Sequence, residues 1–374
     1  MRVNRELRVP LYLQVYERIL TMIREEQWVE GQLLPSEREL SETFGVNRLT
    51  VRRALEMISK EGLVEKIPGV GTRVITPIPP LSVQGNSHCL VFLLPKVPRN
   101  IASGDRITEP FNASLFYSIE NECKKRGYSL IYTTLDEDES LAEILKNREV
   151  TGIFFVSRIS EKYLQEAKHI NIPAVIINND GEFFPTIIPD RETGTYEAVE
   201  YLISLNHRRI AFISGIPDYF TSIACYRGYQ AALRDHCLEV DESLIKEGDW
   251  TFYGGFNAMK EIIEEQTELP TAVFACNDMT AIGAMEAIRS HGLSVPQDIS
   301  VIGFDNIEHS RYCNPTLTTV DVDTALIAQV AAHSLFFSIE NKQSQPVKVT
   351  IPVRLIKRQS TAYCPKARAY VIAK

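Results

Sequence analysis

The feature of the sequence that most restricts the fold is a repeated alternation of short apolar runs with amphipathic stretches. One series holds the runs "CLVFLL", "YSLIYTT", "GIFFV" and "IPAVIIN", with helical stretches near 112–126, 140–146 and 161–169. A second series holds "RIAFIS", "TAVFAC" and "ISVIGF", with helical stretches near 194–205, 223–236, 255–264 and 279–290. Repeated strand–helix units predict parallel sheets covered by helices on both faces. Two such series in tandem predict two similar subdomains with a cleft between them.

Length and composition are those of a globular protein with more than one domain. A chain of 374 residues favours two or three domains. Its apolar runs are too short to span a bilayer, and its first ten residues lack the apolar segment of a signal peptide. The seven cysteines are scattered and form no CxxC pair, which favours reduced thiols over disulfides or a zinc site. We therefore expect a cytoplasmic protein without membrane association, metal or cofactor.

The first eighty residues have a different character from the rest of the chain. They contain 12 Lys and Arg against 11 Asp and Glu, whereas the whole chain has a net charge of −8. Apolar residues recur at helical spacing from Leu11, and Ser36 with Glu39 forms a capping-box signature for a second helix. Asn47 is a suitable N-cap for a third helix, after which "LVEKI" and "TRVI" flank the turn "PGVG". Three helices followed by a hairpin predict a winged helix-turn-helix.

The third helix of this unit carries the pattern expected of a helix that reads DNA. Its apolar stripe leaves Arg48, Arg52 and Arg53 on the other faces. A helix fits the major groove, where arginine forms paired hydrogen bonds with guanine, while other cations fix the register on phosphates. For one helix alone, the better interpretation would be that these arginines only solvate an exposed face. The spacing of the whole unit favours DNA binding instead.

Three segments of this unit, "PLYLQVYERI", "LPSERELSETFGVNRLTVRRALEMISKEGLV" and "PGVGTRV", resemble the DNA-binding domain of GntR-type bacterial regulators over about residues 8–76. The resemblance implies DNA contacts from the "SER" turn, the start of the recognition helix and the tip of the wing. By motif position these contacts are Arg38, Asn47, Arg48, Leu49, Thr50, Arg52 and Gly69. Asn47 stands where serine or threonine is common, and Leu49 at a base-facing position suits a thymine methyl. Both departures indicate an operator preference of its own.

Polar side chains follow several of the strand-like runs in the larger part of the chain. Asn178 and Asn179 follow "AVII", Asn277 and Asp278 follow "VFAC", and Asp305 follows "VIGF". In open α/β sheets, ligands bind at the carboxyl ends of the strands. Each of these residues alone fits an Asx turn or a helix cap at least as well as a ligand contact. Asp278 in particular is expected to be the N-cap of the next helix.

A sugar-like ligand would suit the chemistry of these positions. Asn and Asp side chains can bond vicinal hydroxyls, and Arg227 could fork onto hydroxyls or an acid group. Trp250 and Phe111 could supply flat apolar faces for a sugar ring, although either could equally be a core aromatic. We expect Asp305 and Arg227 to be the main ligand contacts.

The segments "GTYEAVEYLISLNHRRIAFISG", "CYRGYQAAL", "GDWTFYGGF", "VFACNDMTAIGAMEAIRSHGLSVPQDISVIGFDNIEHSRYCNPTLTTV" and "IPVRLIKRQST" resemble the effector-binding domain of LacI-type repressors, over about residues 88–362. The resemblance implies the periplasmic sugar-binding protein fold. It also implies effector contacts at Phe111, Asn178, Arg227, Trp250, Asn277 and Asp305. Asn206 replaces a common glycine, which costs little because asparagine tolerates a left-handed turn. The segment 96–110, just before Phe111, departs from the family's pattern.

The sequence therefore predicts an α/β protein in which an N-terminal winged helix-turn-helix is joined by a linker to a two-subdomain, periplasmic-binding-protein-like domain with doubly wound parallel sheets. The expected boundaries are 1–75 for the DNA-binding domain, 76–88 for the linker, 89–362 for the effector-binding and dimerisation domain, and 363–374 for a C-terminal tail. The linker prediction rests on its Pro, Ser and Gly content and on the absence of either strand or helix periodicity.

A GntR-type reader joined to a LacI-type sensor resembles arabinose-responsive repressors. The resemblance implies a homodimer, formed partly through residues near 116–124, that binds a palindromic double-stranded DNA operator. It further implies repression of carbohydrate-utilisation genes, relieved when a small carbohydrate effector binds the cleft. Architecture alone favours arabinose, while rhamnose, xylose, a hexose or an oligosaccharide are the alternatives. Closure of the cleft would change the spacing of the two DNA-binding heads.

Other functions remain open at this stage. The same residues allow a sugar-responsive activator or a corepressor-type regulator. A transport binding protein is disfavoured by the attached DNA reader, and a constitutive DNA-architecture protein would leave the cleft residues without a purpose. An enzyme is not expected, because the sequence has no nucleophile elbow, P-loop, HExxH or GxGxxG after a strand. Only a trace activity stays open, since sequence cannot measure the separation of an acid and a base.

Overall fold

The computed structural model of the chain describes residues 11–25, 31–60, 64–67, 69–75, 88–96, 106–135, 139–145, 149–341 and 346–365. The chain divides into two compact units, Met1–Ser87 and His88–Lys374. The linker expected at 76–88 lies outside the described residues except for residue 88, and the tail expected at 363–374 lies outside them except for residues 363–365. Among the described helices, none is long and apolar enough to cross a membrane.

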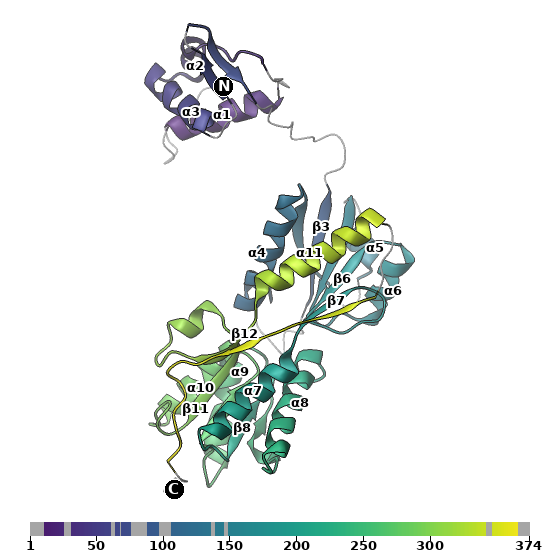
Figure 1. Cartoon of the computed structure of the whole chain (residues 1–374), viewed down its shortest axis with the longest axis vertical. Coiled ribbons are helices and arrows are strands. Elements are labelled where there is room, and N and C mark those ends of the chain that lie inside the picture. The colour runs from purple at the N-terminus through teal and green to yellow at the C-terminus, as the bar shows by residue number, and fades with distance from the viewer. Residues whose placement is uncertain are drawn as a thin grey trace. The chain divides into compact units, whose positions relative to one another are not determined.

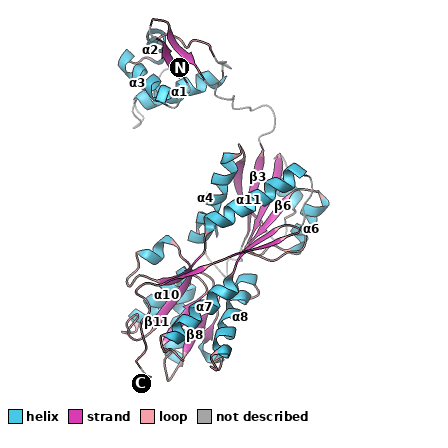
Figure 2. Cartoon of the chain, in the orientation of Figure 1, coloured by secondary structure: helices cyan, strands magenta, loops and turns pink. Residues whose placement is uncertain are grey.

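The first unit is a small three-helix domain with a two-stranded wing (Figures 1 and 2). Its elements are the helices α1 (Leu11–Glu25), α2 (Glu37–Phe44) and α3 (Arg48–Lys60) and the strands β1 (Val64–Ile67) and β2 (Gly71–Val74). The two strands pair antiparallel, and one apolar core joins all five elements. The winged helix-turn-helix predicted from the sequence is confirmed.

Local signals in the sequence fix the ends of these helices. Ser36 and Glu39 form the predicted capping box at α2, with the Ser36 N–H donating to Glu39 Oε2 at 2.7 Å and the Glu39 N–H donating to Ser36 Oγ at 3.3 Å. Helix α2 ends at Gly45, whose left-handed backbone (φ 68°) suits glycine. Asn47 caps α3, because its Oδ1 accepts hydrogen bonds of 2.8 Å from both the N–H and the hydroxyl of Thr50.

The second unit contains two six-stranded sheets, one in each subdomain. The first sheet has the order β13-β7-β6-β5-β3-β4, and all of its strand pairs are parallel. The second has the order β14-β12-β11-β10-β8-β9, and only β14 runs antiparallel. The two doubly wound parallel sheets predicted from the sequence are therefore present, with one antiparallel edge strand.

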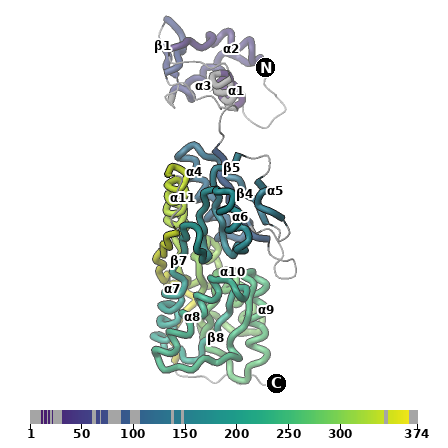
Figure 3. The backbone as a smooth tube through the Cα atoms, turned by 90° about the vertical axis from the view of Figure 1, so that its right-hand side faces the viewer, coloured from purple at the N-terminus to yellow at the C-terminus, as the bar shows by residue number. Residues whose placement is uncertain are grey.

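Helices cover both faces of each sheet, as Figure 3 shows from the side. In the first subdomain α4 and α11 pack on one face and α5 and α6 on the other. Its elements are β3 (Cys89–Pro95), η1 (Arg106–Thr108), α4 (Pro110–Lys125), β4 (Ser129–Leu135), α5 (Leu141–Leu145), β5 (Val150–Val156), α6 (Glu161–His169), β6 (Ala174–Ile177), β7 (Thr186–Pro189), α11 (Thr324–Asn341) and β13 (Lys348–Ile351).

In the second subdomain α7 and α8 pack on one face of the sheet and α9 and α10 on the other. Its elements are α7 (Arg191–Ser204), β8 (Ile210–Ile213), α8 (Phe220–Asp235), η2 (Glu242–Leu244), β9 (Ile245–Lys246), α9 (Phe252–Glu265), β10 (Ala272–Ala275), α10 (Asp278–Ser290), β11 (Ser300–Asp305), η3 (Glu308–Arg311), β12 (Thr318–Asp321) and β14 (Arg354–Ile356). Strands such as β8 and β10 are buried along their whole length, because helices cover them on both sides.

The chain passes between the two subdomains three times (Figure 1). It crosses from β7 to α7, returns from β12 to α11, and crosses again from β13 to β14. Three short connections join two separate sheets, which is the arrangement of domains that close on each other by hinge motion.

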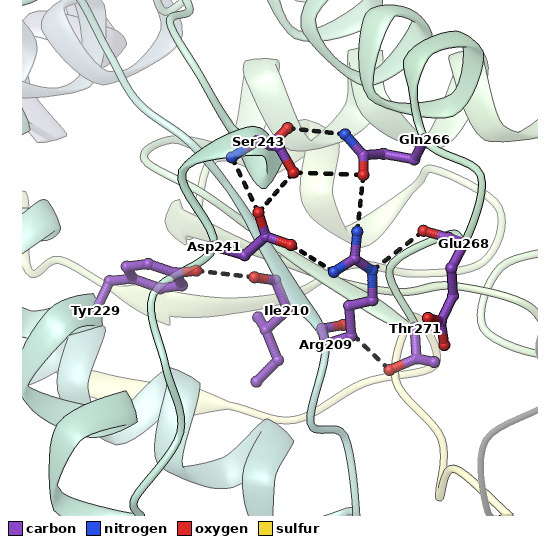
Figure 4. Close-up of polar contacts among 8 residues, drawn as sticks. All are labelled: Arg209, Ile210, Tyr229, Asp241, Ser243, Gln266, Glu268 and Thr271. Carbon is purple, nitrogen blue, oxygen red and sulfur yellow. Dashed lines mark hydrogen bonds and ion pairs between the residues drawn. The ribbon is translucent and has the colours of Figure 1, made fainter.

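A polar network ties together the amino ends of strands in the second sheet (Figure 4). Arg209, just before β8, donates to Asp241 Oδ2 at 2.5 Å, to Gln266 Oε1 at 2.7 Å and to the Glu268 carbonyl oxygen at 3.1 Å. The Tyr229 hydroxyl donates to the Ile210 carbonyl oxygen at 2.9 Å. Ligands bind at the carboxyl ends of such strands, whereas this network lies at their amino ends. Its role is therefore structural.

A buried histidine fastens the C-terminal segment to the same edge. His207 is only 3% exposed; its Nε2 donates to the Ala362 carbonyl oxygen, and its Nδ1 lies 3.0 Å from Thr271 Oγ1. Burial lowers the pKa of this imidazole to about 4, so the folded protein holds it neutral.

This histidine makes stability depend on pH. Because the pKa in the folded state is below the ordinary value near 6.5, the unfolded chain binds more protons, and stability falls as the pH drops from 6.5 towards 4. We expect the wild type to lose about 2 kcal/mol of unfolding free energy between pH 7.5 and 5 that His207→Gln does not lose. Urea unfolding at several pH values measures this difference, and parallel curves for the two proteins would contradict it.

Candidate DNA-binding surface and ligand cleft

The predicted DNA contacts lie on the surface of the first unit. Leu49 is 72% exposed on α3, and Val70 beside Gly69 is 61% exposed at the turn between β1 and β2. Arg38, Arg48, Arg52 and Asn47 are also exposed, and Thr50 is half-buried by its bond with Asn47. Asn47, Leu49, Thr50 and Arg52 share one groove with the start of α1. Leu49 is thus an exposed apolar side chain in the same groove as the polar residues predicted to contact DNA.

Two of the predicted arginines are bonded to carboxylates of their own domain. Arg52 donates to Glu37 Oε2 at 2.9 Å, and Lys66 of the wing donates to Glu37 Oε1 at 2.6 Å, so Glu37 links α2, α3 and β1. Hydrogen bonds from Arg52 and then from Lys66 lower the pKa of Glu37. Arg38 pairs with Glu42 at 3.0 Å, but both side chains are about two-thirds exposed or more, so this pair is weak. DNA phosphates would have to compete with these partners.

A cleft that is open to solvent, with about 550 Å³ of space between its lining atoms, lies between the two subdomains of the second unit. Ser157 after β5, Asn178 after β6 and Cys276 after β10 place it at the carboxyl ends of the strands. Five of the six predicted effector contacts line it, namely Phe111, Asn178, Trp250, Asn277 and Asp305. The remaining lining residues are Glu109, Pro110, Asn112, Ser157, Arg191, Thr221, Cys276, Asp278, Met279 and Ile307.

The sixth prediction, that Arg227 contacts a ligand in the cleft, is wrong about where this side chain lies. Arg227 does not line the cleft and is exposed on α8. The buried face of that helix carries Cys225, Gly228 and Tyr229, so the helical period turns residue 227 towards solvent.

The cationic side chain of the cleft is Arg191 at the start of α7. It is 6% exposed, its Nη2 donates to Asp305 Oδ1 at 2.7 Å, and its Nη1 lies 3.4 Å from the Cys276 carbonyl oxygen. Its Nε has no hydrogen-bond partner, and neither has Asn178 Oδ1 in the same cleft. One is a donor and the other an acceptor, and buried polar atoms of this kind are expected to find partners. Both atoms are shielded from solvent in this structure, so a ligand hydroxyl, which both donates and accepts, reaches them only after the cleft rearranges.

The sequence contained a signal for Arg191 that was missed. Arg191 is the second residue after "TIIP", which forms the buried strand β7, so it lies near a strand end as Asn178 and Asp305 do. The prediction overlooked it because only the longer apolar runs were taken as strands.

The predicted N-cap of α10 is also corrected. Asn277, not Asp278, caps this helix, because its Oδ1 accepts from the Thr280 N–H at 2.9 Å. Its Nδ2 donates to the Trp250 carbonyl oxygen at 2.9 Å, so both ends of the amide are engaged within the protein. Asp278 is fully buried and accepts from the Thr319 hydroxyl at 2.5 Å and the Ile307 N–H at 2.8 Å. Burial raises the pKa of Asp278 well above its usual range.

Unusual backbone conformations gather at this cleft. Ser157 (φ 67°), Asn178 (φ 60°), Trp250 (φ 63°) and Asp305 (φ 103°) all have left-handed backbones and all line it. Such conformations cost of order 1–3 kcal/mol in residues other than glycine, and they cluster at binding sites. The cleft is thus the region in which the second unit holds its side chains in strained, preset positions.

The charges of the cleft favour a ligand without negative charge. The described lining contains three carboxyl groups, Glu109, Asp278 and Asp305, and the guanidinium of Arg191, but burial favours the neutral form of Asp278. Burial raises the pKa of Asp305 to about 6, although Arg191 opposes that rise. Arg191 is already paired with Asp305, so no cation of the described lining is left to bind an anion. The described residues also contain no group of three or more His, Cys, Asp or Glu able to hold a metal ion.

Comparison with known proteins agrees with the division of the chain into a DNA-binding unit and a ligand-binding unit. A model of "Bacterial regulatory proteins, gntR family" matches residues 11–74, and a "Periplasmic binding protein-like domain" matches residues 199–361. The HTH-type transcriptional repressor PurR of Photorhabdus laumondii is 34% identical over 265 residues, which cover 68% of this chain and 77% of that protein. PurR of Escherichia fergusonii is 33% identical over 264 residues, covering 68% of this chain and 76% of that protein. The chain belongs to the LacI family of transcriptional repressors.

Solved structures of the LacI family have the same fold. A LacI family regulator from Enterococcus faecium with bound ribose is 27% identical, has a TM-score of 0.66, and covers 74% of this chain and 99% of its own. The GntR model matches the DNA-binding unit, whereas the periplasmic-binding-protein-like model matches within the second unit. The chain is a DNA-binding transcriptional regulator with a LacI-type effector domain, as its sequence predicts.

Proposed function

We propose that this regulator represses carbohydrate-utilisation genes and releases its operator when a small neutral sugar binds the cleft. The observation that carries the proposal is the cleft itself. It holds residues with strained backbone conformations and two buried polar atoms without hydrogen-bond partners among the described residues. It lies between subdomains that are joined by three short connections. The DNA-binding residues remain those of the prediction, with Arg38, Asn47, Arg48, Leu49, Thr50, Arg52 and Gly69 at the operator. No enzymatic role is proposed.

The effector is proposed to be an uncharged polyhydroxylated molecule. Asp305 and Asn178 accept from hydroxyl groups, Arg191 donates to them, and the rings of Phe111 and Trp250 cover the apolar face of a sugar. A phosphosugar is disfavoured, because Arg191, the cation of the described lining, is already paired with Asp305. The ribose-bound relative supports a pentose-sized ligand, and arabinose stays one candidate among the pentoses.

Control of DNA binding follows from linkage. A sugar can weaken operator binding only as far as it prefers the closed cleft over the DNA-competent arrangement. We expect a preference of ~100-fold, roughly 3 kcal/mol, in a homodimer that places two recognition helices on a palindromic site. If the sugar strengthens DNA binding instead, the same cleft serves a corepressor-type regulator.

Thermal unfolding of the purified chain against a panel of sugars tests the ligand. A sugar at 100 times its dissociation constant should stabilise the folded protein by about 2.7 kcal/mol and raise Tm by a few degrees. Operator affinity is then measured with and without each responding sugar. Arg191→Ala should remove the shift in Tm, whereas the matched control Arg227→Ala should keep it, since residue 227 lies outside the cleft. A response to phosphosugars alone would refute the neutral-ligand proposal.

A further inference from the structure

The exposed face of α3 has two edges with different partners. Val51, Ala54, Leu55 and Ile58 face the core, which leaves Leu49 near the middle of the opposite face. On one edge, Arg52 is bonded to Glu37, which also holds Lys66 of the wing. On the other edge, the guanidinium of Arg53 lies 4.2 Å from the centre of the Tyr12 ring, near the start of α1.

Arg53 keeps its charge available to a partner. Its side chain is exposed, and within the part of the chain that the structure describes no carboxylate bonds to it, in contrast to Arg52 and Arg38. Packing over the ring of Tyr12 fixes the plane of the guanidinium while leaving the N–H groups at its edge free to donate. A preset guanidinium fork of this kind matches the oxygens of a phosphate group.

The position of Arg53 also suits a phosphate more than a base. A helix in the major groove is flanked on both sides by phosphodiester backbones, while the middle of its exposed face meets the bases. Arg53 and Tyr12 line the same groove as Asn47, Leu49 and Thr50, which are predicted DNA contacts. Arg53 therefore stands on the α1 side of the exposed face of α3, about 100° around the helix from Arg52, which shares the groove but is bonded to Glu37.

We infer that Arg53, held in place by the ring of Tyr12, binds a DNA backbone phosphate on the side of the recognition helix away from the wing. The inference rests on the DNA-binding function and adds two residues to it. Tyr12 acts as a positioning residue, because it holds the guanidinium and makes no contact with the phosphate.

The test measures operator affinity of the full chain at several KCl concentrations, on a duplex that the wild type selects from a randomised pool and on an unrelated duplex of equal length. Arg53→Ala should weaken binding about tenfold for each copy of α3 on the DNA, equally on both duplexes. The slope of log affinity against log salt should become shallower by about 1 for each copy. Tyr12→Ala should weaken binding less than Arg53→Ala does, and should add nothing in the double variant.

Two controls keep the outcome interpretable. Arg289→Ala removes a cation that is 75% exposed in the second unit and should leave the salt slope unchanged. Unchanged Tm in every variant shows that the DNA-binding unit still folds. An unaltered slope in Arg53→Ala would overturn the phosphate contact, and a loss confined to the selected duplex would assign Arg53 to base reading instead. A wild type that selects no sequence would overturn the DNA-binding function itself.

Discussion

Alanine at Gly255 or at Gly283 is expected to lower the unfolding free energy of the second unit by about 3 kcal/mol. A Cβ atom on Gly255 would lie 2.1 Å from the Thr280 carbonyl oxygen, and one on Gly283 would lie 2.0 Å from the Phe252 carbonyl oxygen. In both cases the obstacle is backbone, so α9 and α10 must move apart. Alanine would otherwise stabilise a helix by up to about 1 kcal/mol over glycine, so a net loss isolates the steric effect.

The same substitutions should also impair ligand binding. Helix α9 begins two residues after Trp250, and α10 begins one residue after Asn277, which holds the Trp250 carbonyl. Separating the two helices displaces both cleft residues. Urea unfolding and the sugar-induced shift in Tm measure the two effects, with Asn257→Ala on the exposed face of α9 as the control. If Gly255→Ala loses no more unfolding free energy than Asn257→Ala, the two helices do not approach each other this closely.

The sequence predicted the elements of this protein well wherever local signals decide them. The capping box of Ser36 and Glu39, the cap at Asn47 and the alternation of buried strands with amphipathic helices are all present in the structure. Residues after buried strands, such as Asn178 and Asp305, do line the cleft, because parallel strands bring their carboxyl ends to one edge. Their contact with a ligand stays a prediction.

The partners of charged side chains could not be predicted in the same way. Arg191 and Asp305 are 114 residues apart in the sequence, and Glu37 joins Lys66 across 29 residues, so no local pattern relates them. Arg227 was predicted to contact the ligand because sequence gives the type of a residue, whereas the phase of α8 decides where it points. The choice between Asn277 and Asp278 as a cap likewise depends on which side chain the second sheet buries.

Asp305→Asn is expected to cost about 3–5 kcal/mol, more than Arg191→Met, although both break the same buried ion pair. Asparagine keeps an acceptor for Arg191 and tolerates the left-handed backbone of residue 305 (φ 103°), so the cost is that of a buried guanidinium without a counter-charge. Arginine cannot lose its proton in a protein. In Arg191→Met the remaining carboxyl can become neutral instead, because burial already raises the pKa of Asp305 to about 6.

The pH dependence separates this explanation from a simple loss of contacts. A carboxyl group whose pKa is raised on folding stabilises the protein while protonated, and that stabilisation is lost as the pH rises through the folded-state pKa. With Asp305 at about 6 in the wild type, the loss is nearly complete by pH 7. Without Arg191 the pKa of Asp305 rises further, so Arg191→Met should go on losing stability between pH 7 and 8, as urea unfolding would record.

The double variant Arg191→Met with Asp305→Asn removes both charges and should lose less unfolding free energy than Asp305→Asn alone, because no uncompensated charge stays buried. If the two single losses instead add up in the double variant, the two side chains contribute to packing separately, and the pairing of their charges is not what stabilises the cleft.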